Sequence, residues 1–262
     1  MSEEPRVLYQ EEKHTALITL NRAGAMNAFD IKMRTALAEA QAKAEANPDI
    51  RVVVLTGTGK AFSSGTDLKE FASSDKSNGA FDNSVRDYKP LLDNIVKSDK
   101  IYMAAINGFA GGVALGMCLG ADLAIMADDA TVFSPFADVG LVPDGGSSWD
   151  FLKAMGSKRA FAAIAECQRL DANTCLELGM VNKVVSADEL LDSAQTWANE
   201  LSERSPLSLQ YTKRILREAA TLSREQTALL ESEYQMKCAN SEDTTTAIMA
   251  FVAKKKPVFK GK

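Results

Sequence analysis

The most suggestive residue for chemistry is an aspartate in a glycine-rich loop. In SPFADVGLVPDGGSSW (134–149), Asp144 stands between Pro143 and two glycines, among apolar neighbours. Aspartate before glycine is typical of a tight turn. A partly desolvated carboxylate is instead suited to act as a general base. The residues alone leave both interpretations open.

Two earlier stretches place small residues where backbone amides can meet a ligand. FSSGTDL (62–68) follows a β-branched run, and NGFAGGVALG (107–116) joins an apolar strand to an apolar helix. Small residues let the backbone pass close to a ligand, and the first amides of a helix have no internal acceptor. Such N–H groups can stabilise an anion. A tight turn and close helix–strand packing explain the same glycines.

The residues that are absent exclude other chemistries. The single histidine, His14, cannot build a multi-histidine metal site, and any Ser-His-Asp or Cys-His site would have to use it. The four cysteines form no CxxC pair, which favours reduced thiols. The run from Gly57 to Lys60 is not a phosphate loop, because Ala61 stands where Ser or Thr binds magnesium. We therefore expect no metal site.

Composition and charge indicate an ordinary globular protein. The chain has 262 residues, 46% of them hydrophobic and 25% charged, and a formal net charge of -5. This acidic balance argues against a nucleic-acid partner. The acidic N-terminal sequence lacks the features of a signal peptide, so we expect a cytoplasmic protein. The apolar segment 101–121 is interrupted by five glycines, which favours a strand, a turn and a helix over a membrane span.

The elements that must position these stretches alternate in the first half of the chain. Asp30 is a suitable N-cap for a helix over 31–47, and a polar, flexible stretch over 73–83 precedes a helix over 83–97. Strands are predicted over 15–20, 51–57, 101–106, 122–127, 131–134 and 180–185. After Gly146, helices are predicted over 147–155, 157–165, 172–178, 187–204, 207–220, 224–239 and 242–253. This order implies an α/β core with mainly parallel strands and a helical appendage.

The three stretches, in this order and at this spacing, resemble the crotonase superfamily of enoyl-CoA hydratases and isomerases. The similarity runs from about Val7 to Lys262 and includes NRAGAMNAF (21–29), which resembles the family's CoA-contacting loop. It implies an α/β spiral of ββα repeats. Residues 1–200 would form the core with the CoA site and the active site. Residues 201–262 would form a helical region that assembles a homotrimer or a hexamer.

The resemblance also implies roles for individual residues. The backbone N–H groups of Thr66 and Val113 would hold the thioester oxygen as it becomes an enolate, although many family members have glycine where Val113 stands. Coenzyme A is part of the substrate, so no separate cofactor is expected. The substrate-binding residues carried over from the family are Arg22, Ala25, Ser64, Gly65, Asp67, Leu68, Gly112, Phe136 and Leu141.

Departures from the family pattern narrow the expected reaction. Hydratases use two glutamates at the positions of Gly116 and Phe136, and neither residue can do acid–base work. The family's 3-hydroxyisobutyryl-CoA hydrolases have glutamate at the position of Phe136. Its 4-chlorobenzoyl-CoA dehalogenases have tryptophan at that position and histidine at the position of Lys89. The Δ3,Δ2-enoyl-CoA isomerases, which need one acid, remain. The segment GLVPDGGSSW and the C-terminal FVAKKKPVFKGK also resemble the ring-1,2-epoxyphenylacetyl-CoA isomerases.

We therefore expect an acyl-CoA isomerase of fatty-acid β-oxidation, in which Asp144 moves a proton from C2 to C4 of a 3-enoyl-CoA. Ring-epoxide isomerisation, weak hydration and non-catalytic acyl-CoA binding stay open as alternatives. A basic tail suits the phosphates of CoA, although it is equally explained as a solvated end of the chain. Its lysines are Lys254, Lys255, Lys256, Lys260 and Lys262.

Overall fold

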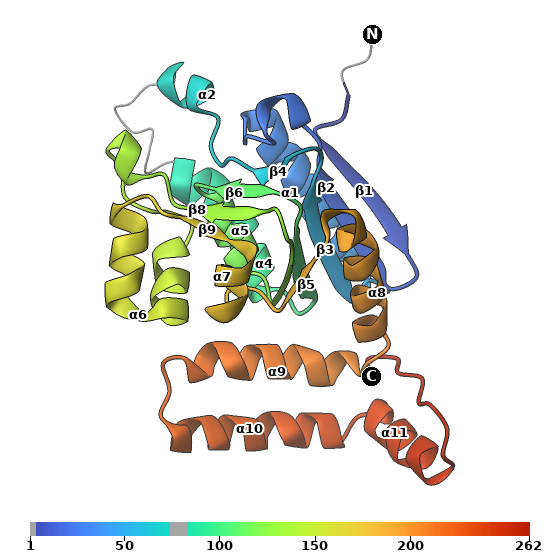
Figure 1. Ribbon diagram of the computed structural model, residues 1–262. Coiled ribbons are helices and arrows are strands. Elements are labelled where there is room, and N and C mark those ends of the chain that lie inside the picture. Colours follow the sequence, from blue (N-terminus) through green and yellow to red (C-terminus); the bar gives the residue numbers. More distant parts are fainter. Residues whose placement is uncertain (1–3, 74–82) are drawn as a thin grey trace.

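Two β-sheets organise the chain in the computed structural model, which describes residues 4–73 and 83–262 (Figure 1). The larger sheet has the order β1-β2-β3-β5-β7-β10. Its first two strands form an antiparallel hairpin, and every later neighbour pairs in parallel. These strands are β1 (Val7–Glu12), β2 (Thr15–Leu20), β3 (Val52–Gly57), β5 (Ile101–Ile106), β7 (Leu123–Ala127) and β10 (Lys183–Val185).

The smaller sheet consists of four short strands in the order β4-β6-β8-β9. They are β4 (Ala61–Ser63), β6 (Phe109–Gly111), β8 (Thr131–Phe133) and β9 (Arg169–Asp171). Each of the first three follows a strand of the larger sheet. Helices return the chain to the larger sheet after β4 and β6, whereas α6 (Ser147–Ala165) leads from β8 to β9 and α7 (Ala172–Glu177) then leads to β10. The chain therefore winds as a spiral of ββα turns, which confirms the expected fold class.

Helices cover both faces of the larger sheet. As a result, the side chains of β5 are buried along its whole length. Helix α8 (Leu190–Ser202) packs on β2, β3, β5 and β7. Helix α1 (Ile31–Ala46) packs on β1 and β2, whereas α5 (Ala114–Leu119) packs on β5 and α4 (Lys89–Lys97) packs between these two helices. The Asp30 carboxylate accepts the Met33 N–H at 2.8 Å, which confirms the expected N-cap.

The predicted elements differ from the observed ones mainly at the strands. All four strands of the smaller sheet are three residues long, and β1, β4, β6 and β9 were not predicted. Helix α6 breaks at Gly156, whose φ of 73° is not helical, so the two helices expected over 147–155 and 157–165 are confirmed. The helix expected over 83–97 begins as a π-helix, η2 (Asn83–Tyr88). The polar stretch 73–83 lies almost wholly outside the described residues.

Three further helices form a separate layer below the sheets in Figure 1. They are α9 (Pro206–Ala219), α10 (Arg224–Ala239) and α11 (Glu242–Val252). Lys213 joins this layer to the core, because its ammonium group contacts the Asp122 carboxylate at 2.7 Å and donates to the carbonyls of Ile95 and Lys100. The expected division at residue 200 stays a prediction.

Shorter helices are η1 (Ala23–Ala25), α2 (Leu68–Ser73), η3 (Ala137–Val139), α7 (Ala172–Glu177) and η4 (Ala187–Glu189).

The C-terminal tail is bound to the protein through its backbone. The Asp243 carboxylate is 2% exposed and accepts the N–H groups of Lys260 at 2.7 Å and Gly261 at 2.8 Å. Arg51 in the core donates to the Phe259 carbonyl at 2.8 Å. The tail is therefore held in place rather than freely solvated. Among the described helices, none is both long and apolar enough to cross a membrane.

Replacing Asp243 by alanine should release the tail. Two hydrogen bonds to a buried carboxylate are lost, so we expect the free energy of unfolding to fall by about 3 kcal/mol. Urea denaturation measures this change, and faster tryptic cleavage after the tail lysines should accompany it. The matched control is Asp188→Ala at an exposed position. Equal stability of Asp243→Ala and the wild type would contradict the role assigned to this carboxylate.

Candidate active site

Three loops converge at one edge of the smaller sheet. Strands β4, β6 and β8 run parallel, so their carboxyl ends lie at the same edge (Figure 1). The three predicted stretches, 62–68, 107–116 and 134–149, continue from the ends of these strands. Together they enclose a cavity of about 290 Å³. Residues predicted at the site that line it are Ser64, Thr66, Leu68, Gly112, Val113, Phe136, Leu141 and Asp144.

The first two loops touch backbone to backbone. Gly65 has a φ of 87° and Gly112 a φ of 60°, values that side chains strongly disfavour. A Cβ atom at Gly65 would lie 2.8 Å from the Gly111 carbonyl oxygen and 3.2 Å from the Val113 nitrogen. Glycine is required at position 65 because no side chain fits between the loops. The Thr66 and Val113 amides therefore lie close together.

Both amides are available to a ligand. Phe29 bridges the first loop, since its N–H donates to the Gly65 carbonyl at 2.8 Å and its carbonyl accepts the Asp67 N–H at 3.2 Å. In such a parallel bridge the intervening residue, Thr66, directs its own N–H away from the partner. Val113 is the N-cap of α5, where amides lack a helical acceptor. Neither amide donates a hydrogen bond to any acceptor in the described part of the chain. The valine side chain is buried and fits.

Asp144 faces this cavity with an unpaired carboxylate oxygen. Its loop is held by Ser147, whose hydroxyl and N–H donate to the Asp144 carbonyl at 2.8 and 3.1 Å. Carboxylate oxygen Oδ1 is buried and has no hydrogen-bond partner among the described residues. Burial raises the pKa of this carboxyl to about 6. A carboxylate with these properties is a proton acceptor near neutral pH.

A second backbone contact seats the Asp144 loop. A Cβ atom at Gly116 would lie 2.1 Å from the Gly145 carbonyl oxygen. No side chain fits at this position while the loop keeps its conformation, so the glutamate of a hydratase is excluded here physically as well as by residue type. At the second hydratase position, Phe136 is 7% exposed and forms part of the cavity wall. Asp144 is thus the one acidic side chain among the described residues of this wall.

Four of the predicted site residues do not line the cavity. Gly65 forms the close turn, and Ala25 lies in η1. Arg22 contacts the Asp67 carboxylate at 2.6 Å, and Asp67 also accepts the Lys69 N–H at 2.9 Å at the start of α2. Its hydrogen bond to Arg22 is the largest cause that lowers the pKa of Asp67. This ion pair joins the 21–29 loop to the 62–68 stretch, and the binding of substrate by Arg22 stays a prediction.

Two residues of the site were missed as functional candidates. Buried Asn27 joins the loops, because its amide donates to the carbonyls of Thr58 at 2.9 Å and Ala61 at 2.7 Å. Tyr88 lines the cavity although its spacing predicted only an apolar helix face. A buried position occupied by tyrosine, where phenylalanine would serve packing equally well, is the signal that could have identified it.

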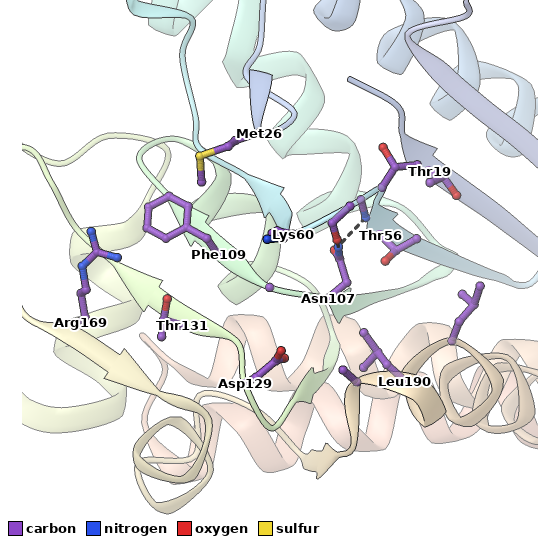
Figure 2. A pocket seen from close by; sticks show the side chains of 16 residues that line it. Thr19, Met26, Thr56, Lys60, Asn107, Phe109, Asp129, Thr131, Arg169 and Leu190 are labelled. Carbon is purple, nitrogen blue, oxygen red and sulfur yellow. Dashed lines mark hydrogen bonds between the residues drawn. The ribbon is translucent and has the colours of Figure 1, made fainter. Parts of the chain in front are cut away.

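A larger hollow of about 800 Å³ lies elsewhere, beyond the carboxyl ends of β3 and β5 (Figure 2). Figure 2 shows Lys60 and Asn107 near its centre, with Arg169 beside the Phe109 ring. It shares no lining residue with the Asp144 cavity. Within the described residues, no cluster of three or more His, Cys, Asp or Glu side chains could hold a metal ion. The Asp144 cavity is therefore the candidate active site.

Comparison with known proteins agrees with this geometry. A family model described as enoyl-CoA hydratase/isomerase matches residues 10–262. The chain belongs to this family, the crotonases. It is 33% identical over 259 residues to 1,2-epoxyphenylacetyl-CoA isomerase of Escherichia coli K12, covering 98% of each chain. It is also 33% identical over 250 residues to carnitinyl-CoA dehydratase of Salmonella enteritidis, covering 94% of each.

A solved crotonase structure supports the same fold. An enoyl-CoA hydratase/isomerase from Mycobacterium abscessus superposes with a TM-score of 0.93 at 32% identity, covering 98% of this chain and 100% of that one. Family membership makes this protein an enzyme that acts on acyl-CoA thioesters by hydratase or isomerase chemistry. Among the proteins matched by name are an epoxyphenylacetyl-CoA isomerase and a carnitinyl-CoA dehydratase, so the relatives leave the reaction of this crotonase open.

Substituting Gly116 by alanine should displace the Asp144 loop. The added methyl group collides with the Gly145 carbonyl, so we expect the free energy of unfolding to fall by about 1–3 kcal/mol. Turnover of enoyl-CoA thioesters should fall as well, because the carboxylate moves while the two amides stay. Denaturant unfolding and steady-state kinetics measure the two effects. Gly24→Ala is the control for stability, since no atom lies within 4 Å of a Cβ atom there. Two equally stable and active variants would disprove the contact.

Proposed function

We propose that this crotonase isomerises a 3-enoyl-CoA to the 2-trans-enoyl-CoA, with Asp144 as the proton shuttle. The observation that carries the proposal is a single unpaired carboxylate facing a cavity that also receives two free backbone amides. One acid and an oxyanion hole are sufficient for a proton transfer within one molecule. They are insufficient for adding water, which requires groups that activate and deliver it.

The reaction starts with the thioester oxygen between the amides of Thr66 and Val113. Ionised Asp144 takes a proton from C2, and the C2–H electrons move through the thioester to give a dienolate. Each backbone donor typically lowers the barrier by about 3–4 kcal/mol, because negative charge develops on the oxygen. Protonated Asp144 then delivers its proton to C4, and the double bond settles between C2 and C3. The proton returns to the substrate, so atoms and charge balance.

The wall of the cavity supports this assignment over hydration. Phe136 and Leu141 contribute apolar side chains to the wall. The Gly145 carbonyl leaves no room for a side chain at Gly116. An apolar wall excludes water, which would otherwise protonate the dienolate or take the proton from the Asp144 carboxyl group between the two steps. A hydratase would need a second acid in this wall, and the described residues that line it include only Asp144.

A second candidate is isomerisation of a ring-1,2-epoxyphenylacetyl-CoA. The 33% identity to the E. coli enzyme of that activity, over nearly the full length of both chains, favours it. The same aspartate and amides would serve. Assays of the purified protein with a 3-enoyl-CoA, a 2-enoyl-CoA and an epoxyphenylacetyl-CoA thioester decide between the two activities and residual hydration.

We also propose the homotrimer or hexamer expected from the family. Met249, Phe251 and Val252 at the end of α11 are 68%, 85% and 78% exposed, and contact with a second copy would cover them. In Figure 1 the C-terminus lies beside α8 and α9, on the opposite side of the view from α6, which follows the Asp144 loop. Contact between the tail lysines and CoA phosphates would therefore come from a neighbouring subunit.

Replacing Asp144 by asparagine should abolish isomerisation. The amide cannot accept the C2 proton, so we expect kcat to fall by about 10²–10⁴-fold with little change in thioester affinity. The matched control is Asp150→Asn, because burial also raises the pKa of Asp150 to about 6 but this carboxyl lies outside the cavity. Near-wild-type turnover by Asp144→Asn would end the proposal.

Activity should follow the ionised form of Asp144. Since the base must be deprotonated, kcat/KM should rise about tenfold per pH unit below a midpoint near 6, the raised pKa of Asp144, and level off above it. The raised pKa also means that the folded state binds this proton more tightly than the unfolded state does. Stability from this group is therefore lost as pH rises from about 4 towards 6, and Asp144→Asn should be no less stable than wild type at pH 7. A value of kcat/KM that stays constant between pH 5 and 8 would count against the role of Asp144 as the base.

A further inference from the structure

Tyr88 is held rigidly beside the two amides. Its ring is 3% exposed and packs edge-on against the Phe29 ring, with centroids 6.1 Å apart. The Arg34 guanidinium lies 5.4 Å from the Tyr88 ring centroid. Phe29 is the residue that bridges Thr66, so the tyrosine is fixed relative to the oxyanion hole.

Arg34 connects this tyrosine to the surrounding helices. The guanidinium contacts Glu70 of α2 at 2.8 Å and Asp87 of η2 at 3.4 Å, and it donates to the Phe29 carbonyl at 3.1 Å. Its charge is therefore shared between both helices that border the cavity. Tyr88 follows Asp87 directly, so these contacts hold the phenol ring in one orientation.

The Tyr88 hydroxyl lacks a hydrogen-bond partner of good geometry among the described residues. Its oxygen is fully buried and makes no hydrogen bond of acceptable geometry with any described residue, although Thr66 and Arg34 lie beside it. Burial raises the pKa of the phenol, so it stays protonated and available as a donor at neutral pH. Asp144 Oδ1 is likewise unpartnered among the described residues, and both side chains line the cavity.

An occupied cavity leaves few acceptors for this donor. A thioester oxygen has two lone pairs, and the amides of Thr66 and Val113 satisfy both. The rest of the wall is largely apolar, with Leu68, Phe136 and Leu141 among its side chains. A purely hydrocarbon acyl group would leave the buried Tyr88 hydroxyl without an acceptor, which is unfavourable for a buried donor.

We propose that the Tyr88 hydroxyl donates a hydrogen bond to an oxygen atom within the acyl group, and that the physiological substrate is an oxygen-bearing acyl-CoA. An epoxide, a cyclic ether or a hydroxyl group supplies the required acceptor. This inference rests on the proposed isomerase and names the substrate class of the same site. Tyr88 is then a specificity-determining residue, and Arg34 is its positioning residue.

The test compares Tyr88→Phe with wild type on acyl groups that differ by one atom. Cyclohexylacetyl-CoA and the three tetrahydropyranylacetyl-CoA isomers have equal ring size, and the isomers carry oxygen at different ring positions. Calorimetric titration gives each dissociation constant without any turnover. We expect wild type to prefer at least one oxygen isomer. Tyr88→Phe should lose about 5–100-fold in affinity for that isomer, and its affinity for the hydrocarbon should stay the same or rise.

Two controls separate this effect from damage to the fold. Tyr102→Phe removes another buried hydroxyl, which donates to Glu45 at 3.0 Å outside the cavity, and it should leave the preference unchanged. Thermal unfolding of Tyr88→Phe should match wild type closely, because the phenyl ring keeps its contacts with Phe29 and Arg34.

Other results would overturn the inference. Equal losses of affinity for the hydrocarbon and the oxygen isomers would assign Tyr88 to the thioester oxygen instead, and no loss for any isomer would leave the hydroxyl without a ligand role. Binding of saturated thioesters does not depend on proton transfer. Failure of the isomerase proposal, seen as turnover by Asp144→Asn, is therefore distinguishable from failure of the role given to Tyr88.

Discussion

Direct contact between backbones is the constraint on which the site depends. At Gly65 and at Gly116, an added methyl group would lie 2.8 and 2.1 Å from a carbonyl oxygen of the facing loop. An amide N–H is short and has no rotatable arm, so two amides reach one oxygen atom only when the chains that carry them nearly touch. The same closeness seats the Asp144 carboxylate. The geometry of the site therefore depends more on glycines, which have no side chain, than on any cluster of polar groups.

The spiral supplies the loops that make these contacts. Strands β4, β6 and β8 are three residues long, yet each delivers one part of the site from its carboxyl end. The larger sheet and its helices provide the buried area that stabilises the fold, and the smaller sheet aligns the three loops. Ion pairs then fix the periphery, because Arg22 holds Asp67 at the start of α2 and Arg34 holds the segment before Tyr88.

The sequence was most informative where signals are local or repeated. A β-branched run predicted β3, and Asp30 predicted the start of α1. The order of three loop motifs carried the resemblance to the crotonases, which implied the spiral. Strands as short as β4 carry too little periodicity to be recognised. The role of Tyr88 could not be predicted, because an unpaired hydroxyl is defined by neighbours from other parts of the chain. Likewise, Arg22 alone indicates a free cation, and its pairing with Asp67 appears only in three dimensions.

The contact between Gly116 and Gly145 also has an evolutionary consequence. A single codon change to glutamate at position 116 would not produce a hydratase, because the new side chain would meet the Gly145 carbonyl before it reached a substrate. The 143–146 loop would first have to be rebuilt, and that change would move Asp144, the proposed base. Divergence within the family at this position is therefore expected to involve the loop and the helix together.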